Sequence, residues 1–469
     1  MNEMQNVIEG SPVKRGARSL FRIVVIVGVV LALLAGCVLA GASWWVMRKM
    51  GPEIWVKMLE ENYNCRCQID DANLSLLSRP AKLVFAGVKI APSDAEVAKP
   101  LSDRTPLADG IAPIVIPEIV LSVKLDDLLN KRIFIEQLKI DSPVVTEMQD
   151  EQGRSSLEAL FRKLSAESEM PLAIPVNAPA AASKPVVTER SSGYTFAVNS
   201  ASLERGQMTI TNKKTLIQVS DFFFTLSDID IQHADLALHN RMHSTLGANI
   251  KVRGEARIGG VKRPAELANL KLSGEGDLVP IDLATGDWMP TTTLKLTLAQ
   301  GSVLAGHITI GDAAGKELKK LQEYGVDLAP VSIGGALLEP AIVEGVFKNN
   351  FFGLRSDTRF VFSEYEVLIE KSSWFNGSQD KHEMDFRLSC GAALQARLQA
   401  GVAKAKLGES LTSGVIKALS DKRGRMTFDI ESKGSLSDPE VKPKLDRILK
   451  NLIRGEGLGD LLQGLLKKL

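Results

Sequence analysis

The stretch IVLSVKL (residues 119–125) alternates apolar and polar side chains from one position to the next. In an extended strand, successive side chains point to opposite faces, so residues two apart share a face. The apolar positions that share one face are Ile119, Leu121, Val123 and Leu125. Ser122 and Lys124 fall on the other face. This period of two predicts a β-strand with one buried and one wet face.

The same alternation recurs along the chain. It is found in LKLS (270–273), TLKLTL (293–298), EMDFRLSC (383–390) and MTFDIE (426–431). The sequence therefore predicts a mainly β, antiparallel fold. Two arrangements remain open, because periodicity does not separate them. The apolar faces either pack against each other in sandwiches, or line one continuous trough. Two observations favour the trough: the strands are not grouped into linker-separated units of about a hundred residues, and aromatic core anchors are few.

The segment IVVIVGVVLALLAGCVLAGASWWV (23–46) contains no charged residue. As a helix it would be roughly 36 Å long, enough to cross a hydrocarbon layer of ~30 Å. Trp44 and Trp45 end it, as is typical of an interface. Four basic residues (Lys14, Arg15, Arg18 and Arg22) precede it and three (Arg48, Lys49 and Lys57) follow. This asymmetry favours a single-pass anchor with a cytoplasmic N-terminus, and places the bulk of the chain on the far side.

Cys37 ends the tetrapeptide LAGC, which matches a bacterial lipoprotein cleavage box. The chain stays apolar for nine residues after Cys37, unlike the polar tether of a cleaved lipoprotein. The pattern favours an uncut anchor. Whether Cys37 carries a lipid stays open.

The composition changes several times along the chain. A helix is expected at 52–63, and the Leu and Ile spacing in 391–421 predicts one or two inserted helices. The sequence accordingly divides into a cytoplasmic tail (1–22), the span (23–46), an N-terminal region (47–164), a Pro/Ala-rich loop (165–192), a β region (193–440) and an amphipathic helical C-terminus (441–469). That last helix either caps the end of the sheet or lies on an anionic surface.

Motifs for catalysis are missing from the sequence. There is no GxSxG elbow, P-loop or HExxH helix, and the few histidines, such as His239 and His243, lack an acid-rich ligand cluster. Cys65 and Cys67 form a CxC pair, in which two free thiols are expected rather than a strained short bridge. The net charge of +1 gives no nucleic-acid footprint. We therefore expect a non-enzymatic protein without a metal, a cofactor or a nucleic-acid partner.

Two longer stretches resemble the AsmA-like family of bacterial envelope proteins. The first is IVLSVKLDDLLNKRIFIEQLKIDSPVVTEMQDEQGRSSLEAL (119–160), and the second is GSLSDPEVKPKL (434–445). In that family a strand leads through a short "-LLNK-" helix to an "I-x-I-x-x-L-x-I-x-x-P" strand. An acid-Gly turn and a short helix follow, and a "G-x-L-S-D-P-x-V" signature precedes the helical tail.

The resemblance implies an inner-membrane protein whose bulk lies in the periplasm. Its elongated, twisted β groove would bind or conduct phospholipid, as in bridge-like lipid transfer proteins. Other envelope proteins would be its partners. We expect the groove to be lined by Ile119, Leu121, Val123, Leu294, Leu296, Phe386, Leu388, Phe428 and Ile430. The alternative is a structural or assembly factor for outer-membrane protein biogenesis that uses exposed strand edges.

Overall fold

The computed structural model describes residues 52–444, apart from 76–77, 109, 125–131, 149–154, 161–194, 213–214, 232–234, 259–260, 285, 287, 305–308, 311–321, 323–324, 333, 405–408 and 436–438. The described chain is mainly β, with few helices, and its strands form one large mixed sheet. Contacts divide it into two compact units. The N-terminal unit holds the described residues within 30–147 and 155–204, and the C-terminal unit holds those within 148–154 and 205–469.

The N-terminal unit is a sheet covered by short helices. Its strands are β1 (Cys65–Ser75), β2 (Ala81–Pro92), β3 (Ile114–Lys124), β4 (Arg132–Asp141), β5 (Val144–Met148), β6 (Thr195–Val198) and the beginning of β7 (Ala201–Thr211). Its helices are α3 (Pro52–Asn62), η1 (Ala95–Ala98), η2 (Leu101–Asp103) and α4 (Ser156–Leu160). Strands β1 to β4 pair in chain order, each antiparallel to the next.

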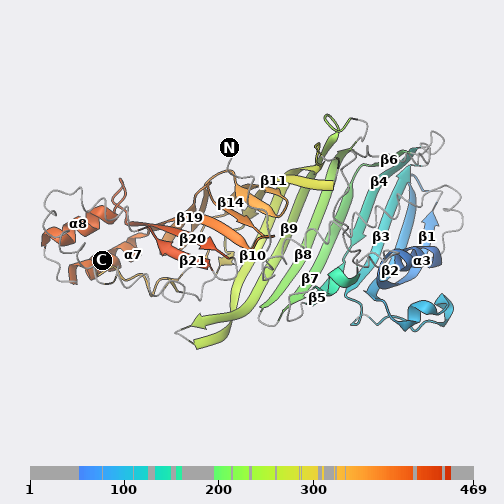
Figure 1. Cartoon of the computed structure of the whole chain (residues 1–469), viewed down its shortest axis with the longest axis horizontal. Coiled ribbons are helices and arrows are strands. Elements are labelled where there is room, and N and C mark those ends of the chain that lie inside the picture. The colour runs from blue at the N-terminus through green and yellow to red at the C-terminus, as the bar shows by residue number, and fades with distance from the viewer. Residues whose placement is uncertain are drawn as a thin grey trace, which may run out of the picture. The chain divides into compact units, whose positions relative to one another are not determined.

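The alternation in β3 buries one face of this sheet, as the sequence predicts. Leu121 is paired with Leu83 on one side and with Leu138 on the other, and all three side chains are buried. The ring of Trp55 on α3 lies edge-on to that of Phe85, with centroids 5.2 Å apart. Figure 1 shows α3 beside β1 and β2. This unit therefore has a closed core between sheet and helices.

The pairings of β4 with two later strands depart from the expected antiparallel pattern. Strand β4 runs parallel to β6 and to the start of β7. A parallel neighbour requires a connection of a dozen or more residues, and residues 142–194 between β4 and β6 are long enough. The sheet is therefore mixed rather than wholly antiparallel.

The C-terminal unit contains the longest strands. They are β8 (Thr215–Ile231), β9 (Asn240–Ile258), β10 (Val261–Ile281), β11 (Trp288–Leu298), β12 (Val303–Leu304), β13 (Gly335–Ala336), β14 (Ala341–Lys348), β15 (Phe351–Leu354), β16 (Thr358–Val361), β17 (Tyr365–Ile369), β18 (Trp374–Asn376), β19 (Lys381–Cys390), β20 (Thr427–Gly434) and β21 (Pro439–Pro443). The two helices are α7 (Ala392–Lys404) and α8 (Glu409–Leu419), which confirms the helical interpretation of 391–421.

Antiparallel pairing runs through this unit in the order β8, β9, β10, β11, β14, β15, β18, β19, β20 and β21. Strand β17 pairs with the second half of β19, and β16 pairs with β17. Figure 1 shows β8, β9 and β10 side by side as long ribbons.

A closed core occupies one end of the C-terminal unit. Its buried members include Leu394, Leu398 and Val402 of α7 together with Leu388 and Phe428 of the sheet. The three α7 residues recur every four positions, so they lie on one face of the helix. Helix α7 thus covers β19 and β20 at this end.

Some of the segments predicted from the sequence lie outside the described residues. The predicted span (23–46) and the loop (165–192) lie outside the described residues. Among the residues that are described, no helix is long and apolar enough to cross a membrane. The predicted helical region 441–469 begins differently, because Val441 belongs to strand β21, and residues 445–469 are not described. Prolines are tolerated in such a strand because it has no further partner among the described strands.

Candidate functional site

In the C-terminal unit, the register of the strands places apolar side chains on one face of the sheet. Directly paired residues of antiparallel strands point to the same side of a sheet. Leu246 of β9 is paired with Gly274 of β10, which is paired with Leu296 of β11, which in turn is paired with Val343 of β14. One face of four successive strands is therefore apolar.

This face continues onto the later strands. Phe347 of β14 is paired with Phe352 of β15, and Phe352 with Phe375 of β18. Phe375 is opposite His382 of β19, and two positions further along β19 the same face carries Met384. Phe386 and Leu388 follow on it, paired with Ile430 and Phe428 of β20. The register thus joins residues about 180 positions apart in sequence on one side of the sheet.

We define the apolar face by side chains that share both this register and a common degree of burial. They are Leu246, Leu272, Leu278, Leu294, Leu296, Leu298, Val343, Phe347, Phe352, Phe375, Met384, Phe386 and Ile430. Each of them is half-buried, and two of them, Leu298 and Ile430, also pack against the closed core beneath α7. Met242 and Ala248 share the register but are buried. A second packed layer would bury such side chains almost completely, as it does in the N-terminal unit. The apolar face is therefore only partly covered.

The opposite face of the same strands is charged and internally paired. Lys295 Nζ lies 3.7 Å from Glu275 Oε1, and Arg387 Nε donates to Asp429 Oδ1 at 2.9 Å. Lys433 Nζ lies 2.9 Å from Glu383 Oε1. Ion pairs of this kind keep their charged ends in water. The opposite face therefore carries these ion pairs, and it also carries the exposed side chains of Ile342 and Phe351.

Alternation in the sequence did not predict the aromatic part of the apolar face. Phe352 and Phe375 stack at 5.2 Å between ring centroids. They lie on β15 and β18, strands of four and three residues, which are too short to show alternation. Only the register across strands places them with Phe347. The sequence does show an aromatic pair in each of these two strands, FF at 351–352 and WF at 374–375.

The predicted lining residues fall into three groups. Leu294, Leu296, Phe386 and Ile430 lie on the apolar face and are half-buried. Leu388 and Phe428 share its register but are 3% and 1% exposed, because the α7 end of the unit closes over them. Ile119, Leu121 and Val123 are buried in the core of the N-terminal unit. The structure brings the first two groups together on one face, and it leaves the third in a separate closed core.

An open depression of about 490 Å³ lies between β8, β9 and β10, near the turn that joins β9 to β10. Its lining includes Arg253, Glu255 and Glu266. Arg253 is paired with Glu266 in register, and Gly254, between Arg253 and Glu255, is paired with Thr215 on the side of the apolar face. The charged side chains of the depression therefore belong to the opposite, polar face. From the side of the apolar face it is lined by Thr215, Gly254 and Ala265.

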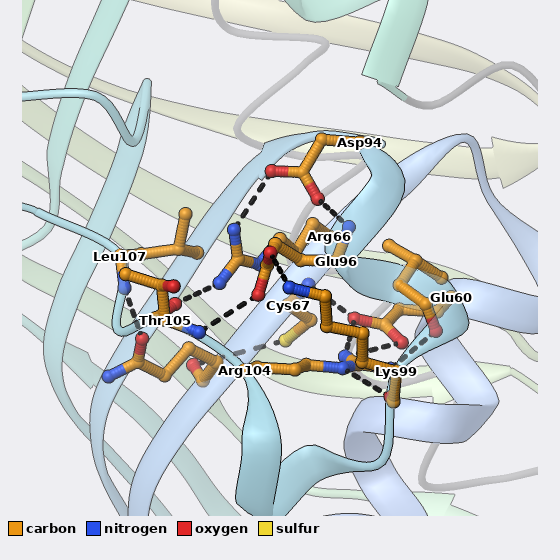
Figure 2. A network of polar contacts seen from close by, with 11 residues as sticks. Glu60, Arg66, Cys67, Asp94, Glu96, Lys99, Arg104, Thr105 and Leu107 are labelled. Carbon is orange, nitrogen blue, oxygen red and sulfur yellow. Dashed lines mark hydrogen bonds and ion pairs between the residues drawn. The ribbon is translucent and has the colours of Figure 1, made fainter.

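A polar network fixes α3 to the N-terminal sheet (Figure 2). Arg104 Nη1 donates to both oxygens of Glu60, at 2.8 and 3.0 Å, and both side chains are largely buried. The Cys67 amide donates to Glu60 Oε1 at 3.0 Å. Arg66 donates to Asp94 Oδ2 at 2.8 Å and to the Thr105 carbonyl. The network ties the helix, β1 and the 94–105 loop together, and each group has a structural partner.

The residues considered for chemistry are dispersed. His243 Nδ1 lies 3.0 Å from Asp277, and His239 Nδ1 lies 2.9 Å from Asp230, so each ring has its own carboxylate. Cys65 and Cys67 are buried and form no disulfide bridge, as predicted. Cys390 is also free and buried, and burial raises the pKa of its thiol to about 12. A neutral, buried thiol is a poor nucleophile.

Comparisons of the chain with protein-family models, with curated proteins and with solved structures gave no match. The resemblance to the AsmA-like family therefore stays a prediction. The function has to be argued from the half-buried apolar face.

Proposed function

We propose that the apolar face of the C-terminal unit binds the acyl chains of phospholipids, and that the protein carries or conducts lipid without covalent chemistry. The observation that carries the proposal is that one continuous register holds thirteen apolar side chains that are only half-buried. Exposed apolar surface of that extent is costly in water and typical of a binding surface.

The physical chemistry of an acyl chain fits such a face. Moving a methylene group from water to an apolar surface stabilises the complex by about 0.8 kcal/mol. An acyl chain therefore needs a run of apolar side chains, whereas its headgroup needs water. The strands supply both, because the charged face and the strand ends stay hydrated. Binding of this kind requires no nucleophile, metal or cofactor.

We further propose, from the sequence, that the chain is a single-pass inner-membrane protein whose β units lie in the periplasm. The charge-free segment 23–46 would be the anchor. The AsmA-like resemblance of 119–160 and 434–445 supports the same assignment. Phospholipid would then be taken from or delivered to the membrane that holds the protein.

The test is the phospholipid content of the full-length protein, purified in a mild detergent and measured by mass spectrometry. The variant Leu296→Asp places a charge on the apolar face, and Thr297→Asp places the same charge on the polar face of the same strand. We expect bound phospholipid in the wild type and in Thr297→Asp, and a loss of most of it in Leu296→Asp.

Wild-type protein that is folded but free of phospholipid would contradict the proposal. Equal lipid content in the two variants would also contradict it. The assembly-factor alternative predicts that equality, because pairing through strand edges uses backbone groups and not the apolar face.

A further inference from the structure

The outer end of the β9–β10 hairpin extends beyond its neighbours. Strand β8 pairs with β9 only as far as the Thr215–Gly254 pair. Strand β12 pairs with β10 only at Ala268 and Asn269. Among the described strands, residues 255–258 and 261–264 therefore pair only with each other. Figure 1 shows this two-stranded end projecting past β8. A projecting ribbon is accessible to a large, flat partner.

The hairpin end and the positions just before it carry exposed cations. Lys262 and Arg263 lie on the projecting end, and Lys251 and Arg253 precede it on β9; among the described residues none of the four forms an ion pair, although Arg253 is the register partner of Glu266. The segment 251–266 also contains Arg257 and two acidic residues, Glu255 and Glu266, so its five basic residues leave an excess of three positive charges. By contrast, Arg387 and Lys433 on β19 and β20 are each paired.

An apolar residue marks the tip. Val261, the first residue of β10, is 54% exposed. It stands next to Lys262 and Arg263, which point to opposite faces because they are consecutive in a strand. An exposed aliphatic side chain with cations on either side fits the boundary between anionic headgroups and acyl chains.

We propose that the outer end of the β9–β10 hairpin docks on the surface of an anionic phospholipid bilayer. Lys251, Arg253, Lys262 and Arg263 would contact the headgroups, and Val261 would enter the interface. Charge complementarity identifies the partner, since anionic bilayers attract clusters of basic side chains. The inference deepens the proposed function and rests on it, because the hairpin would be the place where lipid enters or leaves the apolar face.

The geometry links the tip to the apolar face. Val252 of β9 is paired with Ile217 of β8, and Gly254 with Ala265 of β10, on the same side as Ile250 and the leucines of the apolar face. Small and aliphatic side chains thus continue from that face toward the tip. An acyl chain drawn from a docked bilayer would meet this path first.

The experiment measures vesicle binding by the full-length protein held in phosphatidylcholine nanodiscs. Separate vesicles consist of equimolar phosphatidylcholine and phosphatidylglycerol, or of phosphatidylcholine alone, and binding is measured by flotation. The variant is Lys262→Glu/Arg263→Glu. The matched control is Lys422→Glu/Arg423→Glu, an adjacent Lys-Arg pair that is also exposed and lies in the turn after α8.

We expect the wild type and the control to bind the anionic vesicles, and the hairpin variant to bind at least about tenfold more weakly. Wild-type binding should fall as salt is added, because the attraction is between exposed charges. Equal binding to neutral vesicles, or an equal effect of the two double variants, would overturn the docking proposal.

Phospholipid content, measured on the same samples, separates the two proposals. Docking predicts that the hairpin variant retains its bound phospholipid, which also shows that it is folded. If the wild type holds no phospholipid but still binds anionic vesicles through Lys262 and Arg263, the proposed function fails and the docking surface stands. If phospholipid is present but the hairpin variant binds vesicles normally, only the docking proposal fails.

Discussion

Leu296 lies across Gly274 on the neighbouring strand: a Cβ atom built on Gly274 would come within 2.6 Å of Leu296 Cδ2. The two residues are register partners on the apolar face. The space that a side chain at position 274 would occupy is therefore filled by the side chain of Leu296. A larger residue at position 274 of β10 would collide with Leu296 of β11.

Gly274→Val should consequently displace Leu296 and destabilise the C-terminal unit by about 1–3 kcal/mol. The double variant Gly274→Val/Leu296→Ala should regain part of that loss, because the obstacle is the end of a flexible side chain. Urea unfolding, followed by far-UV circular dichroism, measures both. Gly276 provides the control, since a Cβ there would meet the Thr293 carbonyl oxygen. Gly276→Val should show little rescue by Leu294→Ala, and rescue of equal size in both pairs would contradict this account.

The Glu60–Arg104 pair should hold α3 on the N-terminal sheet. Arg104→Ala leaves the Glu60 carboxylate buried without its cation, and we expect a loss of about 3–5 kcal/mol of stability. Hydrogen exchange of residues 52–62 should rise in parallel. The exposed pair Lys57–Glu61, at 3.7 Å on the same helix, is the control. Lys57→Ala should change stability by no more than ~1 kcal/mol. A comparable effect of the two substitutions would show that Glu60 is not held as described.

Cys390 gives a prediction for alkaline pH. Burial raises the pKa of its thiol from 9.0 to about 12. The unfolded thiol ionises above pH 9, whereas the folded one keeps its proton, so its contribution to stability is complete below pH 9 and declines between pH 9 and 12. Cys390→Ala should flatten the fall of stability across that window, measured as urea midpoints. An unchanged slope would contradict the prediction.

The reactivity of the same thiol provides a separate check. Native protein treated with N-ethylmaleimide at pH 8 should stay unmodified at Cys390, and modification should become complete in denaturant, as read by peptide mass spectrometry. The neutral, buried thiol lacks both the charge and the access that alkylation needs. Rapid labelling of the native protein would mean that the core beneath α7 is open.

Alternation along single strands was enough to predict much of this fold. Leu294 and Leu296, and likewise Phe386 and Ile430, were predicted to point to one face of their strands, and each pair does. A period of two reports which face of a strand is apolar, and it needs no knowledge of the neighbours. The class of the fold and these four members of the candidate site therefore followed from local sequence.

What local sequence could not predict depended on contacts between distant segments. Leu388 and Phe386 have the same alternation, yet α7 covers Leu388 and leaves Phe386 half-buried. The residues of β3 alternate in the same way, but α3 and α4 close their core. Covering helices and cross-strand register are set by tertiary packing, which a strand's own period does not encode.

Strand β21 is a second case. The spacing of the apolar residues from Leu445 onward favours a helical C-terminus over 441–469, but Val441 belongs to a strand that pairs with β20 from Gly434 to Ile430. Proline removes a backbone donor without forbidding an extended edge strand. The break predicted at Asp438-Pro439 therefore precedes a strand, and not a helix.

The central claim is that acyl chains lie against one face of the C-terminal sheet. Site-specific photo-crosslinking tests it most directly, with a photoreactive amino acid placed at Leu294, Leu296 or Phe386 on the apolar face, and at Lys295, Thr297 or Arg387 on the polar face, in the full-length protein in its native membrane. We predict phospholipid adducts, detected by mass spectrometry, at the first three positions and not at the last three. Adducts distributed equally over both faces, or no adduct at the first three positions, would contradict the account.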